Sequence, residues 1–359
     1  MAHRIFTLVT IVAGFIFVTA PVRANPRSDE FRRAGLNRYR EGKFEEAATA
    51  FVQAAEADGS DAQAFFSLGL TYRHLKKMDQ AIEAFKSAVR ADSTYTKAYA
   101  AMGDMYVLTR RLDQARMSYE RAIAADSTFA EGVKKLGAVH HKLALKAYKQ
   151  GKFEEAAAHY ETAARLDPSN AKAYFGLGGA YRKLKRQDRA ILAYETALER
   201  DPGYVKAYLA LGDVFIKEGK YDRAERSYRQ AVRIDPKAAK VYAKLGAVYV
   251  REKRYDKAIP LLREAIAVQP KNSRAHYYLA EAYKNSGYYD QALSSAQTCL
   301  KNDPKNIPAK GIIAECYELL GKTEQAIAAY EELRDAARDQ TWREYAEQKI
   351  ELLSKPSSP

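Results

Sequence analysis

The sequence predicts an all-α protein, built as a tandem array of about nine helical hairpins with one further helix at the C-terminal end. Three observations predict this fold class. An alanine recurs at a nearly constant interval, a small residue and a large aromatic residue keep fixed distances from it, and apolar residues follow three- and four-residue steps. Such steps are typical of amphipathic helices, and a fixed long period is typical of repeat arrays.

The repeat is marked by alanines that follow one another at the same interval, except for one longer interval between Ala115 and Ala156: Ala47, Ala81, Ala115, Ala156, Ala190, Ala224, Ala258, Ala292 and Ala326. A small residue, usually glycine, precedes most of them by twelve positions, and tyrosine or phenylalanine precedes most by nine. Other glycines lie between the two helices of a unit, where a left-handed residue is least costly: Gly42, Gly151, Gly219, Gly287 and Gly321. Several units close with Asp-Pro, because proline cannot extend the preceding helix.

This order of Leu-Gly, Tyr, Ala, Phe or Tyr, Ala and Pro resembles the tetratricopeptide repeat family. The resemblance covers nearly the whole chain after the N-terminal segment, and it implies a right-handed α-solenoid whose concave face is lined by the first helix of each hairpin. We expect the array at residues 28–340, with units at 28–61, 62–95, 96–129, 130–170, 171–204, 205–238, 239–272, 273–306 and 307–340. A cap helix is expected over 341–353 and a flexible tail over 354–359.

The fourth unit is seven residues longer than the others, and the extra residues lie within Leu136 to Gln150. Seven residues make about two helical turns, so the helix can lengthen without rotating its buried face. The extension is either a spur for a partner or a tolerated insertion, and we favour the insertion.

The N-terminal segment has the layout of a secretory signal peptide. His3-Arg4 precedes an apolar run from Ile5 to Ala20, and Val22 and Ala24 supply the small residues expected at the −3 and −1 positions of a cleavage site. We expect residues 1–24 to be removed after Ala24 and the chain to act in the periplasm or cell envelope. An uncleaved anchor is the alternative.

Catalytic and metal-binding patterns are weak throughout. The glycines belong to the repeat, the histidines share no spacing, and paired acids such as Glu45-Glu46 recur at helix starts, where the helix dipole favours them. We therefore expect no enzymatic activity, no metal and no cofactor. Nucleic acid is also disfavoured as a partner, because the aromatic residues lie at packing positions of the repeat.

Cys299 and Cys316 are the only cysteines in the sequence. The resemblance places them on helix faces that pack together, so in an oxidising compartment they would be within reach of a disulfide. Two buried, unpaired thiols are the alternative.

The resemblance assigns the second, fifth, ninth, twelfth and thirteenth residues of each unit to the concave surface. Basic residues gather at the second, twelfth and thirteenth positions, with apolar residues at the fifth. The predicted partner-binding groove comprises Lys97, Lys172, Phe175, Arg182, Lys183, Lys206, Leu209, Lys217, Lys240, Arg251, Arg274, Tyr277 and Lys284. We expect this groove to receive an acidic protein segment. The alternative is that these lysines are ordinary solvated residues.

The formal net charge of +14 favours acidic partners and anionic surfaces. Together with the repeat and the N-terminal signal sequence, it predicts an exported protein–protein interaction scaffold. The alternatives are a periplasmic carrier or chaperone for secreted clients and a peripheral binder of anionic lipid or polysaccharide. Members of the family that grip a C-terminal carboxylate carry asparagine at the ninth position of their first unit. No unit has it here, which disfavours that mode. Homo-oligomers through the terminal units are a further expectation.

Overall fold

The computed structural model describes residues 25–236 and 239–355, with the side chains of residues 239 and 240 left out. Within these ranges the chain forms nineteen α-helices joined by short turns, and no β-strand. The predicted all-α array of helical hairpins is confirmed. The predicted signal peptide and residues 356–359 of the predicted tail lie outside the described residues.

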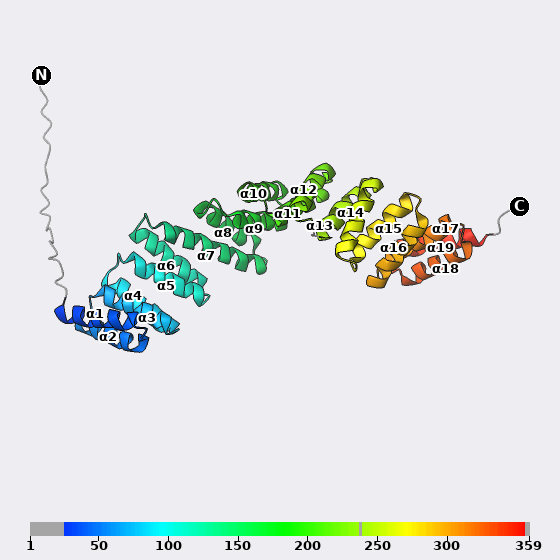
Figure 1. Cartoon of the computed structure of the whole chain (residues 1–359). Helices are drawn as coiled ribbons and strands as arrows, with labels where there is room; N and C mark the ends of the chain where they lie inside the picture. The colour runs from blue at the N-terminus through cyan, green and yellow to red at the C-terminus, as the bar shows by residue number, and fades with distance from the viewer. Residues whose placement is uncertain (1–24, 237–238, 356–359) are drawn as a thin grey trace, which may run out of the picture. The chain divides into compact units, whose positions relative to one another are not determined.

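The chain divides into two compact parts, residues 1–139 and 140–359, which we describe separately. Within each part, consecutive helices pair as antiparallel hairpins (Figure 1). The N-terminal part contains α1 (Pro26–Arg40), α2 (Phe44–Ala57), α3 (Ala62–His74), α4 (Met78–Ala91), α5 (Thr96–Leu108), α6 (Leu112–Ala125) and the beginning of α7 (Ala130–Lys149).

The C-terminal part contains the end of α7 and the helices that follow it in chain order. They are α8 (Phe153–Leu166), α9 (Ala171–Lys183), α10 (Gln187–Arg200), α11 (Val205–Lys217), α12 (Tyr221–Ile234), α13 (Ala239–Arg251), α14 (Tyr255–Val268), α15 (Ser273–Asn285), α16 (Tyr289–Asn302), α17 (Ile307–Leu319), α18 (Thr323–Ala336) and α19 (Gln340–Ser354).

In six hairpins a glycine of the first helix packs against a large side chain of the second helix. A β-carbon at Gly69 would lie 2.5 Å from the ring of Phe85, and one at Gly212 would lie 2.2 Å from the ring of Tyr228. These distances are far below van der Waals contact, so only glycine lets the helices approach this closely. The small residues that precede the repeat alanines by twelve positions therefore include the glycines at which the two helices of a hairpin meet.

The turns inside the hairpins use a left-handed residue. All five glycines expected there have positive φ, as shown by Gly219 at 69°. Four other hairpins place a basic residue with φ between 56° and 59° at the same point: Lys76, Arg110, Lys185 and Lys253. The requirement for a left-handed residue therefore comes from the turn, and glycine is one of two solutions that this chain uses.

Helix α7 is 20 residues long, whereas α9 and most other first helices have 13. The seven extra residues lengthen the helix as expected. Its buried residues follow one stripe through the extension, at Leu136, Val139, Leu143, Ala144 and Ala147. The extension thus keeps the buried face in register.

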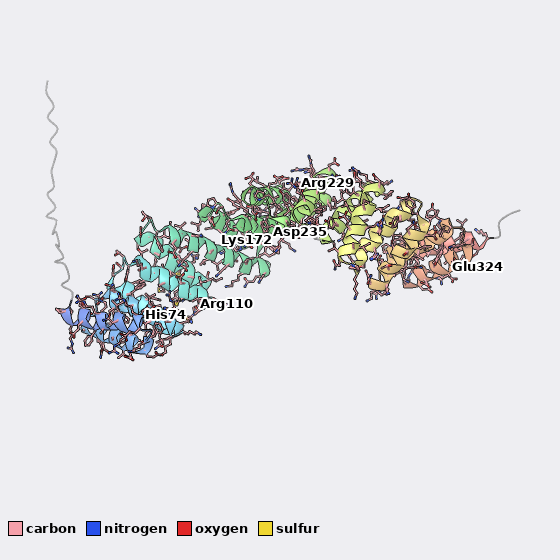
Figure 2. The ribbon with its side chains drawn as sticks, viewed as in Figure 1. His74, Arg110, Lys172, Arg229, Asp235 and Glu324 are labelled. Atoms are coloured by element: carbon pink, nitrogen blue, oxygen red, sulfur yellow. The ribbon has the colours of Figure 1, made fainter. Side chains whose placement is uncertain are left out.

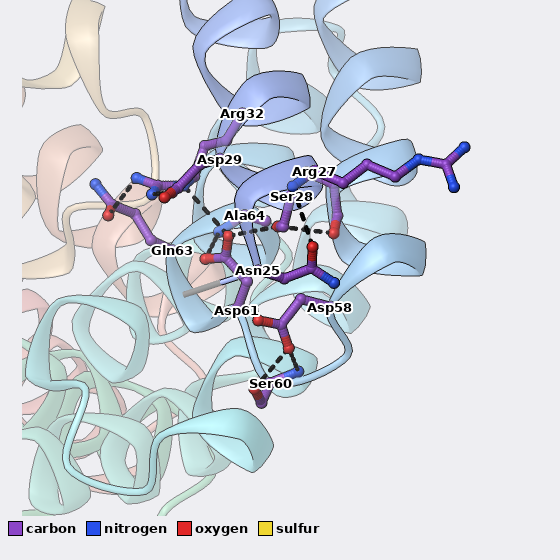
Figure 3. Close-up of polar contacts among 11 residues, drawn as sticks. Asn25, Arg27, Ser28, Asp29, Arg32, Asp58, Ser60, Asp61, Gln63 and Ala64 are labelled. Atoms are coloured by element: carbon purple, nitrogen blue, oxygen red, sulfur yellow. Dashed lines mark hydrogen bonds and ion pairs between the residues drawn. The ribbon is translucent and has the colours of Figure 1, made fainter. Parts of the chain in front are cut away.

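A polar network fixes the beginning of α1 against the α2–α3 turn (Figure 3). The Asn25 side chain donates to the carbonyl of Ala57 at 2.7 Å, and the Ser28 hydroxyl donates to Asp61 at 2.8 Å. The guanidinium of Arg32 lies 3.2 Å from the same Asp61 carboxylate. The first described residue, Asn25, also caps α1 by accepting from a backbone N–H of its first turn.

At the other end of the chain, α19 packs against α18 through Ala346, which is fully buried beside Tyr330 and Leu333. Within the residues that the structure describes, no helix is both long and apolar enough to cross a bilayer.

Candidate functional site

The C-terminal part contains a cavity of about 430 Å³ on the face formed by first helices. Four first helices, α9, α11, α13 and α15, supply nearly all of its walls, and α12 adds one tyrosine. We call this cavity the basic pocket, and it is lined by Arg182, Asp213, Ile216, Lys217, Tyr228, Lys244, Ala247, Val248, Arg251 and Arg274.

The repeat explains why these side chains meet. Lys217 and Arg251 are one repeat unit apart and occupy equivalent places at the ends of α11 and α13. Arg182 lies near the end of α9, and Arg274 lies in the first turn of α15. Since stacked hairpins align their equivalent positions, residues distant in the chain face one cavity.

Five cations and one carboxylate line the basic pocket, which gives it a formal charge of +4. The carboxylate, Asp213, is already engaged. The Lys244 ammonium contacts its two oxygens at 2.6 and 2.7 Å, and the Tyr228 hydroxyl donates to it at 2.7 Å. Among the described residues, the other four cations form no ion pair: Arg182, Lys217, Arg251 and Arg274.

Tyr228 stays a neutral hydrogen-bond donor. Burial and the charge of Asp213 raise the pKa of its hydroxyl above the usual value, and the nearby Arg274 and Arg251 oppose this rise. Burial likewise raises the pKa of Tyr194, with Arg182 opposing it. The phenols therefore contribute no negative charge at neutral pH, and the excess of cations is left uncompensated.

Arg182 carries a further sign of incomplete pairing. Its side chain is half-buried, and its Nε atom is shielded from solvent without a hydrogen-bond partner in the described part of the chain. A buried donor without an acceptor costs about 1–3 kcal/mol. An acceptor supplied by a ligand would remove this cost.

The basic pocket brings together only some of the residues predicted for the groove. Arg182, Lys217, Arg251 and Arg274 line it. Lys284 does not line it and instead forms an ion pair with Glu315.

Other predicted cations lie apart from the pocket. The Lys183 ammonium lies 5.9 Å from the ring centre of Phe153. Lys172, labelled in Figure 2, lies in the first turn of α9 and is exposed. After burial, its charge is the second cause that lowers the pKa of His141. Lys206 is exposed as well.

Two predicted cations cannot be related to the pocket. Lys97 is exposed in the N-terminal part, so it belongs to a separately described body. The side chain of Lys240 lies outside the described residues. That all the predicted cations form one continuous partner-binding groove therefore stays a prediction.

The three apolar residues predicted for the groove are half-buried. Phe175 packs against Tyr194 and Tyr204, with ring centres 5.6 and 5.0 Å apart. Leu209 packs against the core around α13, and Tyr277 lies against the neighbouring Tyr278. Their exposed fractions leave room for contact with a partner.

Lys244 and its pairing with Asp213 were not predicted. A signal for it exists in the sequence: an aspartate followed 15 residues later by tyrosine and 31 residues later by lysine. The same spacing joins Asp104, Tyr119 and Lys135 in the N-terminal part, where the contacts to the carboxylate are 2.6 and 2.9 Å. This recurring triad shows how a ninth-position aspartate is neutralised.

Cys299 on α16 and Cys316 on α17 are both free and fully buried. Burial raises the pKa of each thiol to about 11. Both are therefore protonated and unreactive at neutral pH while the chain is folded. The disulfide between them stays a prediction.

Within the described residues, no group of three or more histidine, cysteine, aspartate or glutamate side chains is arranged to hold a metal ion. An array of stacked helical hairpins is typical of repeat proteins, whose extended concave surfaces bind other proteins. Residues 128–352 match a family model described as the cilia and flagella-associated protein 70 C-terminal domain, and residues 32–96 and 96–129 match two tetratricopeptide repeat models. The chain belongs to the tetratricopeptide repeat family.

Several solved structures are similar to the chain. YrrB, described as a TPR protein with an unusual peptide-binding site, is 22% identical, with 53% of this chain and 97% of that chain covered and a TM-score of 0.48. Yeast Tom70 is 15% identical, with coverages of 91% and 95% and a TM-score of 0.43. MamA from Desulfovibrio magneticus RS-1 is 19% identical, with coverages of 47% and 96% and a TM-score of 0.44. No curated protein matched the chain.

Proposed function

We propose that this protein is a non-catalytic interaction scaffold that holds an acidic segment of a partner protein in the basic pocket. The observation that supports the proposal is the convergence of four cations without carboxylate partners, among the described residues, on one cavity of about 430 Å³. Uncompensated charge of one sign attracts a ligand of the opposite sign and repels cationic segments.

Charge and apolar contact have different roles in this proposal. The cations steer the encounter and set the register of the segment. Ile216, Ala247 and Val248 offer apolar contact inside the pocket, and the half-buried Leu209 adds to it nearby. Binding should therefore weaken as salt concentration rises, without vanishing as a purely electrostatic contact would.

The proposed place of action is the periplasm or cell envelope. The support is the N-terminal sequence, where an apolar run is followed by small residues at Val22 and Ala24. The folded chain begins close behind this segment, since Asn25 already caps α1.

The test is a crosslinking capture of partners from an envelope extract of the producing cells, with the full chain as bait. One variant neutralises the pocket through Lys217→Gln, Arg251→Gln and Arg274→Gln. A matched control removes three exposed cations of second helices through Arg200→Gln, Arg233→Gln and Lys301→Gln. Wild type and control should capture the same protein, and the pocket variant should lose it.

Capture that persists in the pocket variant would contradict the role of the pocket. If all three chains capture no protein but bind vesicles containing about 30% anionic lipid, the charge serves a membrane surface instead. Circular dichroism of each variant would establish that the helices are intact.

A further inference from the structure

The basic pocket carries more positive charge than one carboxylate can balance. Its own carboxylate, Asp213, is consumed by Lys244 and Tyr228, so the four remaining cations face the cavity without compensation from the described residues. A single aspartate or glutamate side chain would neutralise one of them. A run of acidic residues would spread its charge along the groove, whereas these cations surround one cavity.

The donors in the pocket also favour a compact polyvalent acceptor. Three of the four cations that have no carboxylate partner among the described residues are guanidinium groups, at Arg182, Arg251 and Arg274. Arg274 also donates to the Tyr278 hydroxyl at 3.4 Å. Each guanidinium offers planar, paired N–H donors that match the oxygens of phosphate or carboxylate. The buried Nε of Arg182, which has no partner among the described residues, adds a donor that needs an acceptor oxygen.

The size and the lining of the pocket suit a charged group on a side chain. Its volume of about 430 Å³ falls within the range of ligand sites, roughly 300–1,000 Å³. Ile216, Ala247 and Val248 supply an apolar wall for the carbon atoms of that side chain.

We propose that the basic pocket is a subsite for a phosphoryl group carried by a side chain of the partner segment. A phosphorylated serine, threonine or tyrosine has a charge of about −1.5 to −2 and three strong acceptor oxygens. It thereby balances more of the pocket's charge, and satisfies more of its donors, than a carboxylate does. The inference rests on the proposed function, because the phosphoryl group arrives on a segment that the scaffold binds.

The test is fluorescence polarisation with the full chain and labelled peptides of about nine residues in about 0.15 M salt. Three peptides of glycine and alanine differ only at the centre, which is phosphoserine, glutamate or serine, and a fourth carries four glutamates. The phosphoserine peptide should bind at least about tenfold tighter than the single-glutamate peptide, since the phosphoryl group carries a charge of about −1.5 to −2 and three acceptor oxygens, whereas a carboxylate carries one charge and two oxygens, so more charge-assisted bonds form.

Two variants probe the pocket directly. The pair Lys217→Gln and Arg251→Gln should reduce binding of the phosphoserine peptide to the level of the serine peptide, whereas Arg200→Gln with Arg233→Gln should leave it unchanged. Arg182→Lys keeps the charge but removes the planar donors. It should reduce the preference for phosphoserine over glutamate while retaining binding of the four-glutamate peptide.

The outcomes separate the subsite from the scaffold. If phosphoserine binds no tighter than glutamate, the phosphoryl subsite is wrong, and the proposed function survives if the pocket pair still weakens the four-glutamate peptide. If the pocket pair weakens neither peptide, both proposals fail. If inorganic phosphate alone binds as tightly as the phosphoserine peptide, the ligand is a free anion rather than a group on a partner.

Discussion

At Gly178 a β-carbon would lie 2.6 Å from the ring of Tyr194, whereas at the adjacent Gly179 the nearest atom would be 3.8 Å away. The two glycines are neighbours in α9, yet they have different physical roles. Gly178 lets the second helix of the hairpin approach, whereas a β-carbon at Gly179 would meet Tyr148 and the Tyr194 hydroxyl only at ordinary contact distances of 3.8 and 3.9 Å. At the scale of single residues, the fold depends on such positions, where one methyl group would not fit.

This difference gives a paired prediction. Gly178→Ala should lower the free energy of unfolding by about 1–3 kcal/mol, because the added methyl group overlaps the ring of the fully buried Tyr194. Gly179→Ala should leave it unchanged or raise it by about 0.5–1 kcal/mol, since alanine favours the helix and meets only ordinary contacts. Urea unfolding followed by circular dichroism measures both. Equal destabilisation by the two substitutions would show that the Tyr194 contact is not the cause.

Single residues also decide which predicted groove cations are available. Lys217 and Lys284 look alike in the sequence, as basic residues near the end of a first helix. Lys284 is neutralised by Glu315 of the next hairpin, whereas Lys217 has no such partner among the described residues. The register of the repeat predicted the face on which these side chains lie. It did not predict their pairing, because pairing depends on the residue that the next hairpin happens to carry.

At the scale of the hairpin, the turn between the helices is fixed by backbone conformation. Gly219 and Lys185 occupy equivalent places in neighbouring hairpins, with φ of 69° and 58°. Both positions are exposed. A β-carbon at Gly219 would meet no atom within 4 Å, so any effect of substitution there comes from the backbone alone.

A reciprocal exchange tests this account. Lys185→Gly should stabilise the array by about 0.5–1 kcal/mol. The substitution removes the cost of about 1–2 kcal/mol that the left-handed conformation imposes on a residue with a side chain. Part of this gain is lost, because glycine gives up more conformational entropy on folding than lysine does. Gly219→Lys should destabilise it by about 1 kcal/mol. Thermal unfolding of the two single variants and the double variant, each compared with wild type, measures these changes in stability. Destabilisation by Lys185→Gly would mean that the lysine contributes contacts outweighing the strain.

Hairpin geometry was predictable because each unit repeats the same local requirements: a glycine at the crossing, a left-handed turn and a closing proline. The sequence did not predict that four of those turns use a basic residue in the left-handed conformation, because only glycine signals a positive φ in a sequence. These residues are Lys76, Arg110, Lys185 and Lys253. The basic pocket was predictable in part. Four of its cations were predicted from their positions on the first helices, whereas predicting Lys244 would have needed the spacing of the aspartate, tyrosine and lysine triad.

At the scale of the whole array, each hairpin contacts mainly its neighbours. Within the C-terminal part, α17 packs on α16 and α18, and α19 covers α18. In such a quasi-one-dimensional fold, a perturbation at one end should fade within a few units. The terminal helix α19 has a special role there, because it covers the apolar face that another hairpin would otherwise bury.

Removal of this cap is the corresponding prediction. Besides burying Ala346, α19 supplies the Tyr345 hydroxyl to Glu315 at 2.9 Å and the Lys349 ammonium to Glu318 at 2.7 Å. Deleting residues 340–359 exposes the cluster around Tyr330 and leaves both carboxylates with fewer partners. Hydrogen exchange followed by mass spectrometry should then show strong loss of protection in α17 and α18, weaker loss in α15 and α16, and none in α9 to α12. Deletion of residues 356–359 alone should change nothing. Because the basic pocket draws mainly on α9, α11 and α13, partner binding should survive loss of the cap, whereas a loss of protection throughout the C-terminal part would show that its hairpins unfold as one unit.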